Sequence, residues 1–168
     1  MESGESGTSS PPELETGTRE FAATELRVRS AVPRDYDFIT PLLMDLELDY
    51  PSRDLTRFFV GEEHGRILAI AELKEFRDFW LLSCVGVREQ YQGRGLGKAL
   101  LTPLLKPLQK DVYLYTLVPG FFRKLGFAEA ASPPADLPPR SIYGCASCDP
   151  RLCLCLVRKP NAPRISVI

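Results

Sequence analysis

The chain has almost no net charge, a single histidine and no long apolar run. Its 168 residues include 21 Lys and Arg against 22 Asp and Glu, which gives a formal net charge of −1. A protein that binds nucleic acid or an anionic membrane through charge is expected to be strongly basic, so broad affinity for either is excluded. A transmembrane helix needs about 20 consecutive apolar residues, and no segment approaches that length. We therefore expect no nucleic-acid partner and no membrane partner.

Length and hydrophobic content predict one domain. The chain is 44% hydrophobic, and a chain of this length can bury a sizeable core. Residues 1–24 form a Ser-, Gly- and Glu-rich segment without the basic and apolar parts of a signal peptide. We predict a disordered acidic tail over 1–24, a domain over 25–158, a loose tail over 159–168 and a cytoplasmic location.

Strand and helix patterns alternate along the domain. Strands are expected at 26–29, 58–62, 67–73, 79–87 and 112–116, from Phe127 onward and at 152–157. His64-Gly65 is typical of a hairpin turn. Helices are expected to begin at Pro33, at Gly95 and at Phe121, and the second of them to reach Lys110 with a kink at Pro103. This order predicts an α/β (α+β) domain with a mixed sheet.

The most informative segment is Gln92-Gly93-Arg94-Gly95-Leu96-Gly97-Lys98, which follows a predicted strand and opens a predicted helix. Glycines at alternate positions let the backbone turn tightly and bring its N–H groups close to an anion. The positive end of the helix dipole faces the same place, and Arg94 and Lys98 add charge. The segment therefore predicts a phosphate site; the alternative is a glycine-rich turn without a ligand.

The same segment resembles the acetyl-CoA signature of the GNAT acyltransferases, Q/R-x-x-G-x-G/A, which Gln92, Gly95 and Gly97 fill. Downstream, residues 121–127 (Phe-Phe-Arg-Lys-Leu-Gly-Phe) resemble the late helix of that family and its closing Gly-Phe. The resemblance implies a GNAT fold with a mostly antiparallel sheet, flanking helices and a splayed strand pair that holds acetyl-CoA. The cofactor-binding residues it implies are Val85, Gly86, Val87, Gln92, Gly93, Arg94, Gly95, Leu96, Gly97, Lys98 and Phe122.

A narrower resemblance connects the chain with short N-acetylglutamate synthase-like enzymes. It is carried by Tyr115-Thr116, Phe121-Phe122, Leu137-Pro138 and the segment from Cys145 to Cys153. It implies an N-acetyltransferase that acts on a small amino acid, with L-glutamate as the best single choice, in arginine biosynthesis. Two alternatives stay open: another amine acceptor (a polyamine, an antibiotic, a protein Lys or an N-terminus), or a non-catalytic CoA-binding or redox-sensing module. Many relatives form homodimers, and nothing in the sequence decides that question.

The expected reaction is direct transfer in a ternary complex, which needs a base for the amine and an acid for the leaving thiolate. Phe122 occupies the position where the superfamily usually has a tyrosine acid, so we predict Tyr115 as the substitute; the alternative is an aromatic core residue. Glu72 is the predicted base, with Glu75 and Asp78 nearby; the alternative for each is a solvated surface charge. His64 is predicted to serve only the turn.

An amino-acid acceptor needs cations for its carboxylates, and Arg is best suited to them. Arg27, Arg29, Arg77 and Arg140 are candidates, and we predict Arg27 and Arg77 as substrate-binding residues.

Cys145, Cys148, Cys153 and Cys155 are spaced C-x2-C-x4-C-x-C. Three alternatives stay open for them: a structural zinc site, a reversible redox disulfide, or free thiols. Cys84 is predicted to be a small buried residue.

Overall fold

The described residues form a seven-stranded mixed sheet between two layers of helix. The computed structural model describes residues 25–144, 149 and 151–160. The strands are β1 (Arg27–Ser30), β2 (Phe58–Glu63), β3 (Arg66–Glu75), β4 (Phe79–Val87), β5 (Asp111–Thr116), β6 (Ala128–Glu129) and β7 (Leu154–Arg158). The helices are α1 (Tyr36–Asp45), α2 (Leu96–Leu105) and α3 (Pro119–Arg123). The strand order is β1-β2-β3-β4-β5-β7-β6, with β4 and β5 parallel and all other neighbours antiparallel. The predicted mixed, mostly antiparallel sheet is confirmed.

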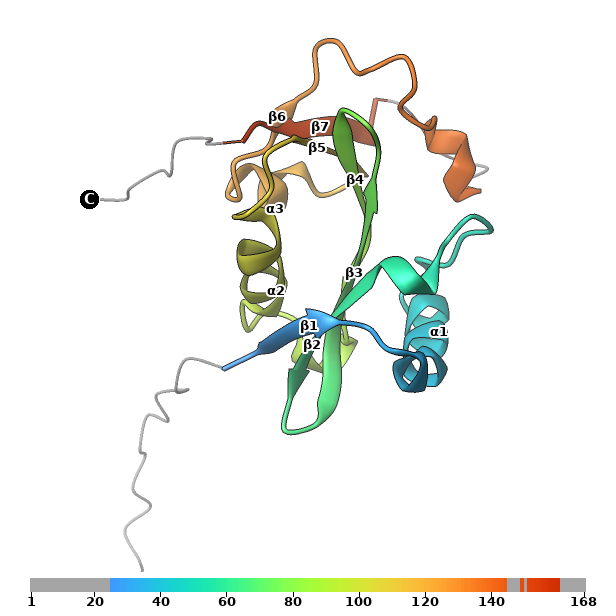
Figure 1. Cartoon of the computed structure of the whole chain (residues 1–168), viewed down its shortest axis with the longest axis vertical. Helices are drawn as coiled ribbons and strands as arrows, with labels where there is room; N and C mark the ends of the chain where they lie inside the picture. Colours follow the sequence, from blue (N-terminus) through green and yellow to red (C-terminus); the bar gives the residue numbers. More distant parts are fainter. Residues whose placement is uncertain (1–24, 145–148, 150, 161–168) are drawn as a thin grey trace, which may run out of the picture.

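The two faces of the sheet carry different helices (Figure 1). α2 and α3 cover one face, which we call the α2 face; α1 and the short 3₁₀ helix Arg140–Tyr143 lie on the opposite side, the α1 face. Leu100 and Leu101 of α2 are fully buried on the first side, and Ile39 and Leu43 of α1 on the second. Ile39, Leu42 and Leu43 form the apolar stripe of α1 that packs on the sheet. No helix within the described residues is both long and apolar enough to cross a membrane.

The β2–β3 connection is the tight hairpin that the sequence predicts. His64 and Gly65 both have positive φ, 52° and 74°, as a two-residue type I′ turn requires. The His64 side chain is 90% exposed, which agrees with a turn residue.

Several predicted boundaries differ from the structure: β3 ends at Glu75 instead of Leu73, and α3 begins at Pro119 instead of Phe121. Two further differences each have a local reason. α2 ends at Leu105 instead of Lys110, because Pro107 has no N–H to donate to the helix. Pro103 lies inside α2 and does not end the helix. β7 begins at Leu154 instead of Leu152. The Asp149 carbonyl accepts the N–H groups of Leu152 and Cys153, which holds these residues in a turn.

The predicted tails lie almost wholly outside the described residues. This applies to 1–24 and to 159–168 apart from Lys159 and Pro160.

β4 and β5 separate along their length, and this opening positions the site. Their parallel ladder joins only Phe79–Leu81 to Asp111–Tyr113. Beyond it, among the described residues, the edge of β4 that faces β5 has no strand paired with it. The splayed strand pair implied by the family resemblance is present.

Candidate active site

The glycine turn lies at the wide end of the opening between β4 and β5. Gly93 and Gly95 have φ of 82° and 77°, a left-handed backbone that favours glycine. Gly95 is the N-cap of α2, so the free N–H groups of the first helical turn point out beside it. The Gln92 side chain donates through Nε2 to the Val87 carbonyl at 3.0 Å. This bond ties the turn to the end of β4.

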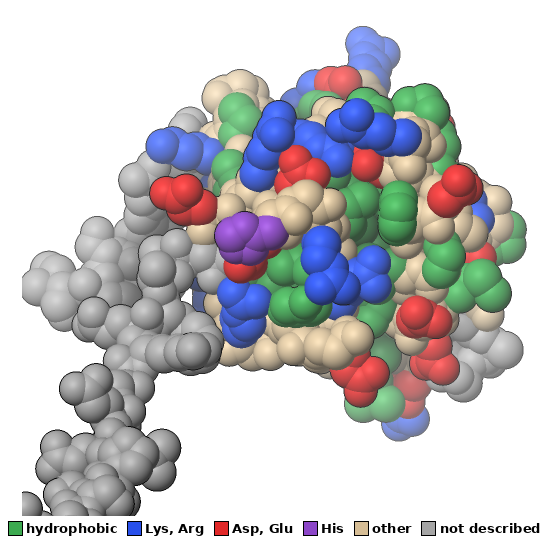
Figure 2. All heavy atoms as spheres, turned by 90° about the horizontal axis from the view of Figure 1, so that it is seen from below, with side chains coloured by type: hydrophobic (Ala, Val, Ile, Leu, Met, Phe, Trp, Pro, Cys, Tyr) green, Lys and Arg blue, Asp and Glu red, His purple; other side chains and the backbone are tan. Residues whose placement is uncertain are grey.

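Basic side chains surround this end of the molecule (Figure 2), where several lie near His64 of the β2–β3 turn. Arg94 reaches from the glycine turn to Glu63 at 3.3 Å and lies over the Tyr91 ring. Arg66 of β3 donates to the Tyr91 hydroxyl at 3.4 Å, and Lys98 lies on the first turn of α2. Together with the helix N-terminus, these groups make a positive surface suited to phosphate.

A β-bulge in β4 lies at the point where the strands part. Ile70 pairs with Gly86 and Glu72 with Ser83, so Ala71 faces two residues of β4, Cys84 and Val85. Cys84 has φ of 51°, an unusual backbone for a non-glycine residue. A bulge turns backbone groups away from the ladder, and here it leaves N–H and carbonyl groups of β4 available to a ligand in the opening.

The predicted cofactor residues of β4 lie on this segment. The side chains of Val85 and Val87 pack toward the α2 face, against the cluster that contains Phe122. A Cβ at Gly86 would lie 2.6 Å from the Leu46 Cδ1 and 2.8 Å from the Leu48 Cδ1, so these side chains would have to shift to admit one. The glycine therefore lets the end of α1 approach β4 closely.

Phe122 is buried in the core. It is 6% exposed and packs edge-on against Phe121 and Phe127. Gly97 of α2 touches the same group, since a Cβ there would lie 3.0 Å from the Phe121 ring. Phe121 and Phe122 thus hold α3 against the start of α2.

On the α1 face, the bulge adjoins a buried group of acid and tyrosine side chains. We call Tyr50, Glu72, Ser83 and Tyr143 the polar cluster. Glu72 is 1% exposed; it accepts a short hydrogen bond from the Tyr50 hydroxyl and one of 2.8 Å from the Asp54 N–H. The hydroxyls of Ser83 and Tyr143 lie 2.6 Å apart, and the Tyr50 and Tyr143 rings touch with centroids 4.8 Å apart. The two hydrogen-bonded pairs therefore form one contiguous group beside the bulge.

Burial changes the acid–base properties of this group. Desolvation raises the pKa of Glu72 above its ordinary value, and the hydrogen bonds from Tyr50 and Asp54 oppose that rise. Burial also raises the pKa of Tyr50 and of Tyr143, which stay protonated at neutral pH. The pKa of the Cys84 thiol is raised by burial as well; its Sγ donates to the Leu48 carbonyl at 3.4 Å. The predicted burial of Cys84 is confirmed.

The rings of Tyr50, Tyr143 and Tyr115 form a row of contacts that leads from the polar cluster toward β7. The Tyr115 ring stands edge-on to Tyr143 with centroids 6.2 Å apart, and the Tyr115 hydroxyl donates to the Pro138 carbonyl at 2.7 Å. The Arg140 guanidinium lies over the same ring, 4.9 Å from its centroid. Cys155 is the direct β7 partner of Tyr115. Burial raises the pKa of Tyr115, so the hydroxyl is a proton donor and not a base at neutral pH.

The predicted substrate arginines lie elsewhere. Arg27 is on the edge strand β1, with a side chain 75% exposed that pairs with Glu62 at 3.4 Å. Arg77 is exposed in the β3–β4 turn, at the opposite end of β4 from the bulge. Arg29 is bound by Asp35 and Glu62. Of the four candidate arginines, only Arg140 lies beside a predicted catalytic residue.

The cysteine predictions are tested only in part. Cys84 and Cys155 are free and buried, Cys153 is buried, and the described part of the chain contains no group of three or more His, Cys, Asp or Glu side chains placed to hold a metal ion. Cys145 and Cys148 lie outside the described residues. Zinc receives no support from this, and the redox alternative stays a prediction.

Tyr50, Ser83 and Tyr143 were not among the residues predicted from sequence. Each comes from a different part of the chain, and no motif connects them. Glu72 was identifiable because it is a single carboxylate within the apolar run Ile67–Leu73.

Known proteins resemble this chain in sequence or in fold. Residues 24–127 match the model of the acetyltransferase (GNAT) family. N-acetylglutamate synthase from Neisseria gonorrhoeae, solved with coenzyme A and L-arginine, has a TM-score of 0.62 at 24% identity over 81% of this chain. The chain spans only 33% of that protein's length.

Two further solved structures match most of both chains. Rv2747 from Mycobacterium tuberculosis, in complex with CoA and the ligand NLQ, has a TM-score of 0.63 at 20% identity and covers 79% of this chain and 98% of its own. An acetyltransferase of the GNAT family from Staphylococcus aureus Mu50 has a TM-score of 0.60 at 16% identity, with 79% and 98% covered. At these identities the structures show a shared fold. The family match, the glycine turn and the splayed strands lead to one conclusion: the chain belongs to the GNAT family of acetyltransferases, which transfer the acetyl group of acetyl-CoA.

Proposed function

We propose that this protein is an N-acetyltransferase that moves the acetyl group of acetyl-CoA to the amine of a small amino acid, with L-glutamate as the preferred acceptor. One observation carries the proposal. The opening between β4 and β5 has the glycine turn at one end, and the β4 bulge beside it adjoins a buried carboxylate–tyrosine cluster. A phosphate site and an acid–base site are thus joined along one strand.

The cofactor would lie along β4. Its pyrophosphate fits the N–H groups at the start of α2, next to Gly93 and Gly95. Its pantetheine arm carries amide groups that fit the unpaired backbone of Val85 and Val87, as an added strand would. The thioester then lies near the bulge at Cys84 and Val85. A backbone N–H at the bulge would stabilise the oxygen of the tetrahedral intermediate.

Amine deprotonation falls to Glu72. Its raised pKa makes it a better base than an exposed carboxylate. Since Glu72 is 1% exposed and bonded to the Tyr50 hydroxyl, we propose that the proton passes through Tyr50, with water on the substrate side. The neutral amine attacks the thioester carbon, a C–N bond forms and the C–S bond breaks.

The thiolate then needs a proton, for which we propose Tyr115. Its hydroxyl proton is donated to the Pro138 carbonyl, so it must exchange that bond for one to the sulfur. Tyr143 is a second hydroxyl of the same row, and its bond to Ser83 places it next to the β4 bulge. Removing each hydroxyl in turn distinguishes the two tyrosines.

Three points support glutamate. The narrower family resemblance implies it, N-acetylglutamate synthase from N. gonorrhoeae has also been solved with coenzyme A and N-acetyl-glutamate at a TM-score of 0.62, and an arginine lies beside Tyr115. A polyamine acceptor would instead favour a pocket rich in exposed carboxylates. On this proposal the enzyme acts in arginine biosynthesis in the cytoplasm.

The test is release of CoA from acetyl-CoA by the purified protein, followed by chromatography with a panel of amino acids, polyamines and peptides. A reaction without acceptor corrects for hydrolysis. We expect turnover with L-glutamate to exceed that with lysine, spermidine or a peptide. Preference for another amine would overturn the acceptor, and CoA binding without transfer to any amine would favour the non-catalytic alternative.

A further inference from the structure

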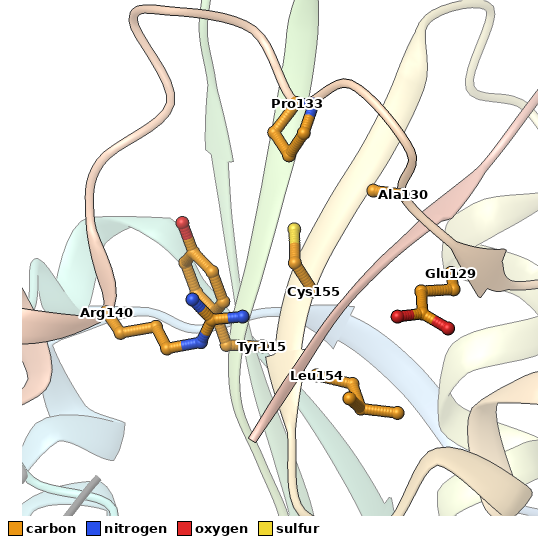
Figure 3. Close-up of a pocket in the computed structure, with 7 residues that line it drawn as sticks. All are labelled: Tyr115, Glu129, Ala130, Pro133, Arg140, Leu154 and Cys155. Carbon is orange, nitrogen blue, oxygen red and sulfur yellow. The ribbon is translucent and has the colours of Figure 1, made fainter. Parts of the chain in front are cut away.

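A cavity of about 180 Å³ lies between β5, β7 and the loop that follows β6 (Figure 3). Its lining residues are Tyr115, Glu129, Ala130, Pro133, Arg140, Leu154 and Cys155. Figure 3 shows the Arg140 guanidinium lying across the Tyr115 ring at one side of this space. This volume is enough for the end of a small ligand.

The Arg140 guanidinium is fixed in place but not satisfied. Its Nε donates to the Cys153 carbonyl at 2.9 Å, and its plane contacts the Tyr115 ring. Within the part of the chain that the structure describes, neither terminal nitrogen has a hydrogen-bond or ion-pair partner. A guanidinium that is held through its Nε can donate one N–H from each terminal nitrogen to the same carboxylate, which is a bidentate contact.

Glu129 lines the same cavity and makes no ion pair with Arg140 among the described contacts. Arg140 is therefore the cation of this cavity, and it can bind one anionic group of a ligand. A second anion beside Glu129 would be repelled.

The Arg140 side chain is connected to the β4 bulge through a row of contacts. The Tyr115 ring lies under the guanidinium, Tyr143 lies against Tyr115 at 6.2 Å, and the Tyr143 hydroxyl reaches Ser83, which precedes the bulge. Two aromatic rings therefore lie between Arg140 and the β4 bulge, where the thioester is proposed to lie. In an amino acid the α-carboxylate is only two bonds from the amine, whereas the side-chain carboxylate of glutamate lies further away.

We infer that Arg140 binds the side-chain carboxylate of the acceptor and so selects glutamate over glutamine. This inference rests on the proposed function, since it places the acceptor amine at the β4 bulge. Arg140 is a specificity residue here; it takes no part in proton transfer.

The experiment compares L-glutamate with L-glutamine in wild type and Arg140→Gln. Loss of a charge-assisted bidentate contact costs roughly 10- to 100-fold in affinity, so we expect the KM for glutamate to rise by that factor. The KM for glutamine and the kcat should change less than about twofold. An equal rise for both substrates would mean that Arg140 only supports the loop, and would overturn the inference.

Two control variants separate charge from position. Arg27→Gln removes an exposed arginine on the edge strand β1, and Arg77→Gln removes an exposed arginine at the far end of β4. Neither should change the glutamate-to-glutamine ratio. If either changes it as much as Arg140→Gln does, the selectivity is a general effect of charge and the inference is wrong.

A binding measurement distinguishes failure of the inference from failure of the proposed function. Calorimetric titration of the CoA-saturated protein with glutamate needs no turnover. Binding that Arg140→Gln abolishes, without acetylation of any amine, supports the carboxylate site and rejects the enzyme proposal. Acetylation of glutamate that Arg140→Gln leaves unchanged rejects the site and keeps the enzyme. Neither binding nor turnover rejects both.

Discussion

The two sides of the β4–β5 opening are built in different ways. The proposed cofactor side consists mainly of backbone from one continuous stretch, from the bulge at Cys84 to the first turn of α2. The proposed acceptor side consists of side chains from distant segments, such as Tyr50, Glu72, Tyr115 and Arg140. Backbone N–H groups recognise phosphate and amide whatever the neighbouring side chains are. The acceptor side depends instead on which side chains the fold brings together.

This difference explains why one side can be recognised in the sequence and the other cannot. The glycine turn needs positive φ at fixed positions, so its residues are restricted and recognisable. The polar cluster needs only a carboxylate and hydroxyls at suitable points in space. Variants on the two sides should therefore fail in different ways, with the largest loss of activity at the buried carboxylate and the smallest at ion pairs remote from the opening.

Glu72→Gln should lower kcat about 100-fold, because general-base catalysis contributes at least this factor. Gln is isosteric and can still accept from the Asp54 N–H and donate to the Tyr50 oxygen, so we expect the fold to survive. CoA binding should be unchanged. Glu75→Gln, an exposed carboxylate on the same strand paired with Lys110, is the matched control. Equal kcat for both variants would remove Glu72 from the mechanism.

Wild-type kcat should also depend on pH through Glu72. Burial raises its pKa above the ordinary 4.5, and the carboxylate is active only when deprotonated. The acid limb of kcat should therefore lie above pH 4.5 and vanish in Glu72→Gln. Stability depends on pH in the opposite direction to kcat. Because the raised pKa favours the protonated native form, the contribution of Glu72 to the free energy of unfolding decreases as pH rises through that pKa.

Tyr115→Phe should lower kcat about tenfold, with little change in KM for either substrate. The effect is modest because a thiolate is already a good leaving group. Tyr143→Phe is the informative comparison, since it removes the other hydroxyl of the row while keeping its ring. If Tyr143→Phe lowers kcat more than Tyr115→Phe, then Tyr143 is the acid and Tyr115 serves to hold the loop at Pro138.

Gly95→Ala should weaken CoA binding about tenfold by forcing a side chain into a left-handed backbone at the start of α2. Crowding is not the cause, since no atom would lie within 4 Å of a Cβ added at this position. Gly65→Ala is the control, with φ of 74° and equally open surroundings in the β2–β3 turn. Both variants should lose about 1–2 kcal/mol of stability; equal losses of CoA affinity, measured by calorimetry, would contradict a phosphate site at α2.

Asp35→Asn should hardly change activity at low temperature but should lower stability by about 2 kcal/mol. Asp35 accepts two hydrogen bonds from Arg29 and one from the Val32 N–H. These contacts, chiefly the bonds from Arg29, lower its pKa from 3.8 to about 2. The contribution is present above pH 3.8 and is lost as pH falls through about 2, so wild type and variant should converge in acid. Thermal unfolding across this pH range and up to neutrality measures this; a constant difference would contradict the ion pair as its cause.

Much of the fold could be predicted from sequence because its signals are local. Period-two and 3.6-residue patterns predict most strands and helices, and His64-Gly65 predicts its turn. The end of α2 and the start of β7 depend instead on local features at Pro107 and Asp149. Arg27 and Arg77 show why the acceptor-binding residues were harder to predict. An arginine is basic wherever it lies, and the sequence does not reveal which arginine faces a cavity.

The family and the glycine turn can be recognised in the sequence alone, because Gly93 and Gly95 adopt a left-handed backbone that favours glycine. Glu72 could also be named from the sequence as a candidate base on its strand. Three contacts depend on tertiary packing: the Tyr50 hydroxyl bonds to Glu72, the hydroxyls of Tyr143 and Ser83 lie within hydrogen-bond distance, and the Arg140 guanidinium lies over the Tyr115 ring. The Tyr50–Glu72 contact joins residues 22 positions apart, and the Ser83–Tyr143 contact joins residues 60 positions apart. Burial of both faces of the sheet sets the strand pairing that brings these residues together. Their geometry follows from packing, and packing is a property of the whole chain.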